Sequence, residues 1–71
     1  MSQKQLEELA KELTIRFLNE PDSEGFGVEL PNKIVAYARN KKFKKVLKKY
    51  LEDLNLEEVL FEIKVIGKVS L

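Results

Sequence analysis

The last third of the chain alternates between apolar and polar side chains almost without interruption. The apolar members are Val59, Phe61, Ile63, Val65, Val69 and Leu71, and the polar members are Glu62, Lys64, Lys68 and Ser70. A period of two over this length predicts a long C-terminal strand, over residues 58–70, with one buried face. The backbone of a strand needs hydrogen-bonding partners. These must come from residues 26–30, from residues 33–38, or from the same strand of a second copy.

Two other segments have the apolar spacing of amphipathic helices. Residues 3–19 carry one apolar stripe, and Ser2 followed three positions later by Gln5 predicts a capping box at its start. Residues 42–54 show the same spacing. We expect both helices to pack these stripes on a small sheet that the C-terminal strand dominates. The expected core consists of Leu6, Leu9, Leu13, Phe17, Val28, Ile34, Val46, Leu47, Tyr50, Leu54, Phe61, Ile63 and Val65.

Residues 31–40 are compatible with two structures. In a hairpin, residues 30–33 form a type I turn and residues 34–37 form the returning strand. In a helix, Pro31 occupies the first position, where its missing N–H costs nothing. If the next helix began at Lys41, its lysines would crowd the positive end of the macrodipole, at about 0.3–1 kcal/mol for each exposed contact. This cost favours a helix over residues 31–39 that breaks near Asn40.

The predicted fold class is α+β, in two layers. The expected order is helix, strand, short helix, helix and long C-terminal strand, with the helices packed on a small sheet. The 71 residues make one domain, residues 1–71. A chain this short buries only about 60% of the surface of its unfolded form, so its core is marginal unless it is very regular or oligomeric.

Positive charge is concentrated in residues 31–50, which contain no acidic side chain. The basic residues of this segment are Lys33, Arg39, Lys41, Lys42, Lys44, Lys45, Lys48 and Lys49. The rest of the chain is acidic, so the formal net charge of +1 conceals a strong separation of charge. In a helix, the lysines at positions 41–49 lie opposite the apolar stripe, where they form a positive surface about two to three turns long.

Such a surface attracts phosphate backbones and gains affinity from the release of counterions. The eight basic residues are therefore the candidate nucleic-acid-binding residues, with Lys33 and Arg39 extending the helix surface. Arginine is scarce, and because arginine dominates readout of base edges, we expect binding that is insensitive to sequence. Tyr37 and Tyr50 are the only aromatic side chains near enough to stack on a base.

The sequence offers little for catalysis or for cofactors. It contains no histidine and no cysteine, which supply many bases, nucleophiles and soft metal ligands. Its three glycines form neither a phosphate loop nor a dinucleotide fingerprint. Glu20, Asp22 and Glu24 begin a calcium-loop pattern, but Pro31 stands where a bidentate glutamate is required. We therefore expect no enzyme activity, no metal and no cofactor.

Composition also bears on location and origin. The chain has neither the apolar run of a signal peptide nor a stretch of about 18 apolar residues that would span a membrane. We therefore expect a cytoplasmic protein without a membrane partner. Heavy use of lysine and glutamate without cysteine is typical of thermostable proteins, and equally of designed sequences.

Three interpretations of function remain open. The first is a small binding module for nucleic acid, which the helix lysines contact without sequence preference. The second is a homodimeric interaction module that pairs through its C-terminal strand, with the lysines solvated or facing acidic subunit contacts. The third is a designed or redesigned protein without a natural ligand.

One segment resembles a known family. The expected order over residues 26–69 is strand, helix, turn, helix and strand, and Val28-Glu29-Leu30-Pro31 is similar to the lead into the first helix of KH-type RNA-binding cores. The resemblance implies RNA binding. The glycine-rich turn that grips the backbone in that family is replaced here by Arg39-Asn40-Lys41-Lys42. Without those glycines the main chain does not approach phosphates closely.

Overall fold

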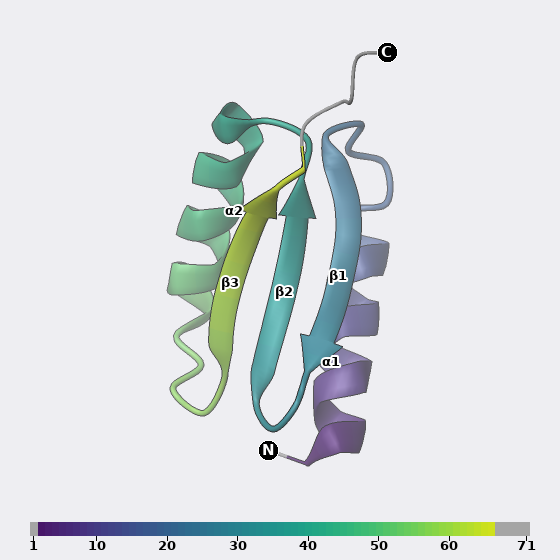
Figure 1. Cartoon of the computed structure of the whole chain (residues 1–71), viewed down its shortest axis with the longest axis vertical. Helices are drawn as coiled ribbons and strands as arrows, with labels where there is room; N and C mark the ends of the chain where they lie inside the picture. The colour runs from purple at the N-terminus through teal and green to yellow at the C-terminus, as the bar shows by residue number, and fades with distance from the viewer. Residues whose placement is uncertain (1, 67–71) are drawn as a thin grey trace.

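A computed structural model describes residues 2–66 of the chain (Figure 1). Its elements are helix α1 (Gln3–Arg16), strands β1 (Ser23–Glu29) and β2 (Lys33–Ala38), helix α2 (Lys41–Leu54) and strand β3 (Leu60–Val65). The three strands form one mixed sheet in the order β1-β2-β3. The expected α+β class is confirmed.

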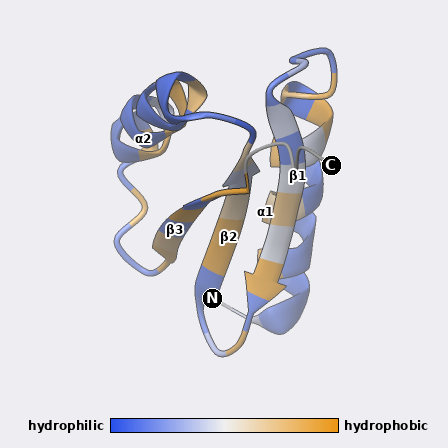
Figure 2. Ribbon diagram, turned by 45° about the horizontal axis from the view of Figure 1, so that its top comes forward, coloured by the Kyte–Doolittle hydropathy of each residue, from blue (hydrophilic) through white to orange (hydrophobic). Residues whose placement is uncertain are grey.

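Both helices cover the same face of the sheet, and no described helix or strand covers the other, which we call the open face. In Figure 1 they lie behind the strands, with α1 packed mainly on β1 and α2 mainly on β3. Figure 2 shows apolar stretches along the strands and a largely hydrophilic α2 ribbon. Within residues 2–66, neither helix has the length and apolar character needed to cross a membrane.

The start of α1 follows the predicted capping box. The Ser2 hydroxyl accepts a hydrogen bond from the Gln5 amide at 3.2 Å, and the Gln5 side chain accepts one from the Ser2 amide at 2.8 Å. The helix ends at Arg16 rather than at residue 19. Turns then lead to β1, which contains an irregularity between Ser23 and Phe26 where Gly25 adopts a φ of 104°. Glycine reaches this backbone region without the steric cost that other residues incur.

The helix predicted over residues 31–39 is wrong, because this segment contains the second strand of a hairpin. β2 pairs antiparallel with β1 and parallel with β3, so its backbone is hydrogen-bonded on both sides. It also buries Ile34, Ala36 and Ala38. These gains outweigh the macrodipole contacts at the start of α2, which cost about 0.3–1 kcal/mol each. The Leu30–Pro31 peptide bond in the turn is cis.

The order that resembled a KH-type core is consequently absent from residues 26–66. The observed order there is strand, strand, helix and strand. The segment Arg39-Asn40-Lys41-Lys42 connects a strand to a helix, not one helix to another.

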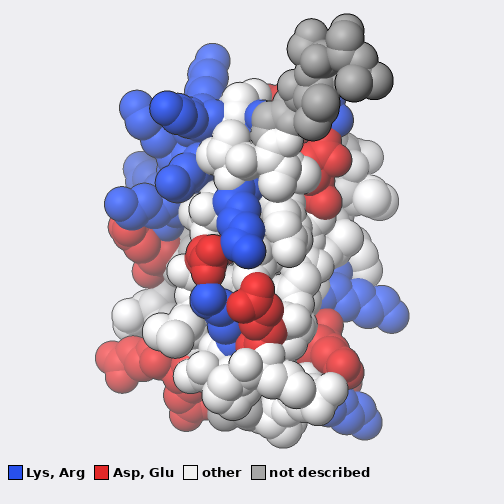
Figure 3. Space-filling view, viewed as in Figure 1, with Lys and Arg blue, Asp and Glu red and all other residues white. Residues whose placement is uncertain are grey.

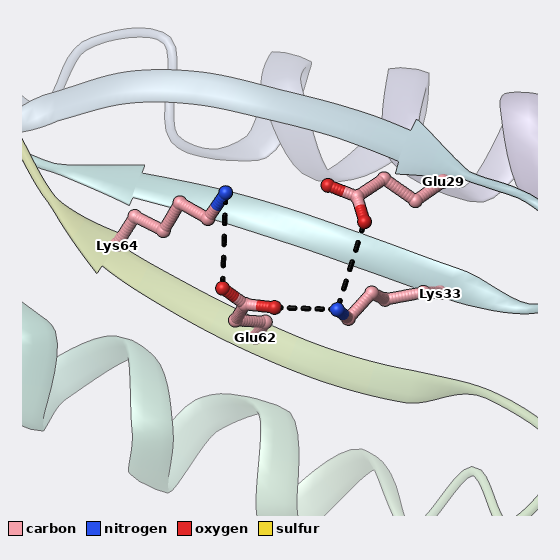
Figure 4. Close-up of polar contacts among 4 residues, drawn as sticks. All are labelled: Glu29, Lys33, Glu62 and Lys64. Carbon is pink, nitrogen blue, oxygen red and sulfur yellow. Dashed lines mark ion pairs between the residues drawn. The ribbon is translucent and has the colours of Figure 1, made fainter.

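The partner of the C-terminal strand is β2, which pairs with it in parallel. The predicted alternation holds at its centre: Phe61 and Ile63 pack against the core, while Glu62 joins an ion-pair network on the open face (Figure 4). β3 spans Leu60–Val65, and the portion of the predicted strand at residues 67–71 lies outside the described residues. β3 is an edge strand, since β2 lies on one side of it and no described strand lies on the other.

The core lies between the sheet and the two helices. Phe17, which follows α1, links β1 to α2 within the core. Its ring contacts the rings of Phe26 in β1 and of Phe43 and Tyr50 in α2, at centroid distances of 5.8, 5.9 and 5.1 Å. Leu6, Leu13, Ile34 and Leu47 are buried as predicted. Val46 and Val65 were predicted to lie in the core, but they are 53% and 38% exposed. Buried residues that the core prediction left out are Ala10, Val35, Ala36, Ala38, Phe43, Leu51 and Val59.

Candidate nucleic-acid interface

The lysine-rich helix begins at Lys41, and Asn40 determines that position. Asn40 has an extended backbone (φ −147°, ψ 170°), and its side-chain oxygen accepts a hydrogen bond from the Phe43 amide at 2.8 Å. Asparagine is among the best N-cap residues because it satisfies a donor that has no partner within the helix. The helix ends at Leu54, and Asn55 caps it in the left-handed conformation.

Helical periodicity separates the two faces of α2. Phe43, Leu47 and Leu51 are buried against the sheet. The six lysines of the helix are all exposed, and we call them the α2 lysine surface: Lys41, Lys42, Lys44, Lys45, Lys48 and Lys49. Figure 3 shows the positive side chains gathered over the α2 side of the molecule. The structure therefore brings these six predicted residues together on one element.

The surface extends around both flanks of the helix. Lys48 lines a hollow beside β3, and Lys44, one turn earlier, shares that flank. Lys42 and Lys49 lie two turns apart on the other flank, toward the side that carries Tyr50. Lys41 and Lys45 lie between the flanks. The positive charge therefore covers the crest and both sides of the exposed half of α2.

Charge is also unevenly distributed along the helix. All six lysines precede Tyr50, whereas Glu52 and Asp53 occupy the last turn. The N-terminal end of a helix carries a partial positive charge and the C-terminal end a partial negative charge. The lysines at the N-terminal end and the acidic residues at the C-terminal end of α2 therefore both destabilise the helix. The first turn contains no acidic residue that would compensate.

None of the six lysines has a carboxylate within ion-pairing distance among the described residues. Three other basic side chains do have one: Lys33, Lys64 and Arg39. Lys33 lies on the open face of the sheet, with its ammonium 2.5 Å from a Glu62 oxygen and 3.6 Å from a Glu29 oxygen (Figure 4). Lys64 lies 3.8 Å from the other oxygen of Glu62. The sheet separates Lys33 from the α2 lysine surface.

The ion pair between Lys33 and Glu62 affects both titrating groups. The hydrogen bond from Lys33 holds the pKa of the Glu62 carboxyl below its ordinary value, because it stabilises the charged form. The same hydrogen bond, with further attraction from Glu29, raises the pKa of the Lys33 ammonium. Partial desolvation opposes both shifts.

Arg39 lies at the junction between β2 and α2. Its Nε donates a hydrogen bond to Glu24 Oε1 at 2.8 Å, and its terminal nitrogen contacts the same oxygen. Arg39 is therefore close in sequence to the α2 lysine surface but is already neutralised by a carboxylate of β1. Glu20, Asp22 and Glu24, which begin the calcium-loop pattern, form no metal-binding group among residues 2–66.

Neither tyrosine lies on the α2 lysine surface. Tyr37 is on the open face of the sheet, where its ring covers Gly27: a Cβ on that glycine would lie 3.7 Å from the ring. Tyr50 packs edge-on against Phe17, with the Arg16 guanidinium 5.3 Å from its centroid. The surface that carries the six lysines thus offers no aromatic ring to a base.

A hollow of about 380 Å³ lies between the C-terminal half of α2 and β3. Its apolar lining comes from Leu51, Leu56, Phe61 and Ile63, and its polar rim includes Lys48 and Glu52. In Figure 1, α2 lies beside the outer edge of β3. One flank of the lysine-bearing helix therefore faces this hollow and the outer edge of the sheet.

Comparisons of the chain with protein-family models, with curated proteins and with solved structures found no match.

Proposed function

We propose that this protein is a small, non-enzymatic cytoplasmic module that binds nucleic acid through the phosphate backbone. The observation that supports this proposal is the α2 lysine surface: six exposed ammonium groups on one helix, with no carboxylate partner among the described residues. Ammonium groups in this state are surrounded by mobile water and ions. When such ammonium groups bind a polyanion, they take the place of its condensed counterions, which are released into the solvent.

The electrostatics of α2 favour an anionic partner. The fold keeps four lysines in the first five residues of a helix whose N-terminal end is already positive. This arrangement costs stability, at about 0.3–1 kcal/mol for each exposed contact near the terminus. Phosphate groups placed there would reverse the sign of these contacts. Binding and folding are thus linked, and the ligand should stabilise the protein.

Lysine contacts predict binding without sequence preference. An ammonium group is a compact point charge, whereas base readout relies on the planar, bidentate geometry of arginine or of amides. Arg39, which carries such a group near the surface, is paired with Glu24. We restrict the proposed interface to the six helix lysines, because Lys33 and Arg39 already have carboxylate partners.

The test is a salt series of binding to labelled duplexes of unrelated sequence. We expect similar affinity for each sequence, and an affinity that falls steeply with salt. The slope of log K against log salt should approach about −0.9 for each phosphate neutralised, or about −5 if all six lysines take part. The absence of binding at low salt would rule out the proposal and would favour a sequence without a natural ligand.

The outer edge of β3, which no strand within residues 2–66 covers, favours a second candidate, self-association. Antiparallel pairing of two β3 strands about Ile63 would place Glu62 of one copy opposite Lys64 of the other, which is a favourable cross-strand pair. The same arrangement would bring two lysine-rich α2 helices together, because each lies beside the outer edge of its β3. Sedimentation distinguishes this candidate from the first: added salt should strengthen self-association and weaken nucleic-acid binding.

A further inference from the structure

We infer that the preferred ligand is double-helical DNA and that the N-terminal half of α2 lies in its major groove. This inference rests on the proposed function and specifies the ligand of the same surface. It follows from the exposure of the lysine-bearing side of α2, from the placement of its lysines on both flanks, and from the charge at its C-terminal end.

The lysine-bearing side of α2 is exposed to solvent. One flank of the helix borders the hollow beside β3, which Leu51 and Phe61 line. The other borders a hollow between the helices, lined by residues that include Leu13, Arg16 and Leu54. Both hollows border the C-terminal part of α2, from Lys48 onward. The part of α2 that precedes Lys48 would meet a groove with its exposed, lysine-bearing side. The major groove of B-DNA is about 12 Å wide and admits an α-helix.

The two flanks of α2 carry equivalent charges. Lys44 and Lys48 lie on the flank near β3, and Lys42 and Lys49 lie on the opposite flank. A helix in a groove has a phosphate strand on each side, so that ammonium groups on both flanks find phosphates. A helix that merely rests on one backbone strand would leave one flank in water. The bilateral distribution therefore matches a groove better than a single strand.

Other nucleic acids match the surface less well. The major groove of A-form RNA is deep and too narrow for side chains to read. Single strands are held largely by stacking of bases on aromatic rings. Tyr37 lies on the open face of the sheet, and Tyr50 is already packed edge-on against Phe17.

The acidic end of the helix determines its orientation. Glu52 and Asp53 occupy the last turn of α2, where phosphates would repel them. The N-terminal half, from Lys41 to Lys49, should therefore lie deepest in the groove. At about 1.5 Å per residue this half is about 12 Å long, which spans roughly two helical turns.

The experiment compares four ligands and two charge-matched variants. The ligands are duplex DNA, duplex RNA, single-stranded DNA and inorganic polyphosphate, at one salt concentration. The variants are Lys44→Gln with Lys48→Gln, and Lys42→Gln with Lys49→Gln, each checked by circular dichroism for an unchanged fold. We expect duplex DNA to bind about tenfold or more tightly than the other ligands, and each variant to lose about tenfold or more in affinity.

Three results would overturn the inference. Equal affinity for duplex DNA and for duplex RNA or single strands would leave backbone binding intact but remove the preference for the major groove. Loss of affinity in only one of the two variants would place the helix against a single backbone strand. Absence of binding to every ligand would remove the proposed function as well.

Discussion

The side-chain oxygen of Asn40 accepts a hydrogen bond from the Phe43 amide at 2.8 Å, and this contact fixes the start of α2 at Lys41. The position matters because a start several residues earlier would move the lysines away from the positive helix end. Asn40→Ala should lower the free energy of unfolding by about 1 kcal/mol through loss of the cap. Asn40→Asp keeps the acceptor and adds a favourable charge, so it should unfold at a higher denaturant concentration than Asn40→Ala. Urea titration measures both changes.

Lys41→Glu should stabilise the fold and weaken binding at the same time. It replaces an unfavourable charge in the first turn with a favourable one, which should raise the free energy of unfolding by about 1 kcal/mol. Lys49→Glu makes the same change of charge in the third turn, beyond the reach of the terminus, and is the matched control. A Lys41→Glu protein no more stable than Lys49→Glu would contradict the argument that α2 opposes its own macrodipole.

Much of the helix and strand content could be predicted from local pattern. The stripe that begins at Leu6 and the alternation through Ile63 each reflect the period of one element, which the sequence displays directly. Residues 31–39 could not be predicted in this way. The macrodipole cost at Lys41 favours a helix there, whereas the structure depends on pairing of this segment with β1 and with β3, which is distant in the sequence.

The candidate site was predictable to a similar degree. The exposure of the six helix lysines follows from the 3.6-residue period once α2 is recognised. The pairing of Lys33 with Glu62 and of Arg39 with Glu24 follows from the register of the sheet. That register depends on the β1–β2 hairpin, whose turn residues are equally compatible with a helix start, and on the parallel pairing of β3, which has no local signature.

Adjacent residues of α2 test the orientation of the helix. Leu47 is fully buried, whereas Val46, which was also expected in the core, is 53% exposed. Leu47→Ala should lower the free energy of unfolding by about 2–5 kcal/mol, because it removes buried contacts and leaves a cavity. Val46→Ala should change it by less than about 0.5 kcal/mol, as surface substitutions usually do. Comparable losses in both variants, measured by denaturant unfolding, would contradict the observed orientation.

The Lys33–Glu62 pair predicts a dependence of stability on pH. Because the folded pKa of Glu62 lies below its ordinary value of 4.5, the pair stabilises the fold above that pH, and the contribution is lost as the pH falls through the folded pKa. Lys33 has a raised pKa, so its contribution is present below pH 10.5 and is lost as the pH rises through the folded pKa.

Glu62→Gln provides the measurement. Its deficit in stability relative to the unmodified protein should be largest near neutral pH and should shrink as the pH falls below 4.5. Glu8→Gln, which removes an exposed carboxylate of α1, controls for the change in net charge. A deficit that stays constant from neutral to acidic pH would show that the ion pair does not contribute.

The most direct test of the account is whether the position of the lysines, and not the total charge, determines nucleic-acid affinity. Two triple variants each remove three positive charges: Lys44→Gln, Lys45→Gln and Lys48→Gln on α2, and Lys4→Gln, Lys11→Gln and Lys64→Gln elsewhere. Their dissociation constants for one duplex DNA are compared at one salt concentration. We expect the α2 variant to lose about 100-fold in affinity and the other to remain within about threefold of the unmodified protein. Equal losses in the two variants would contradict the proposed interface.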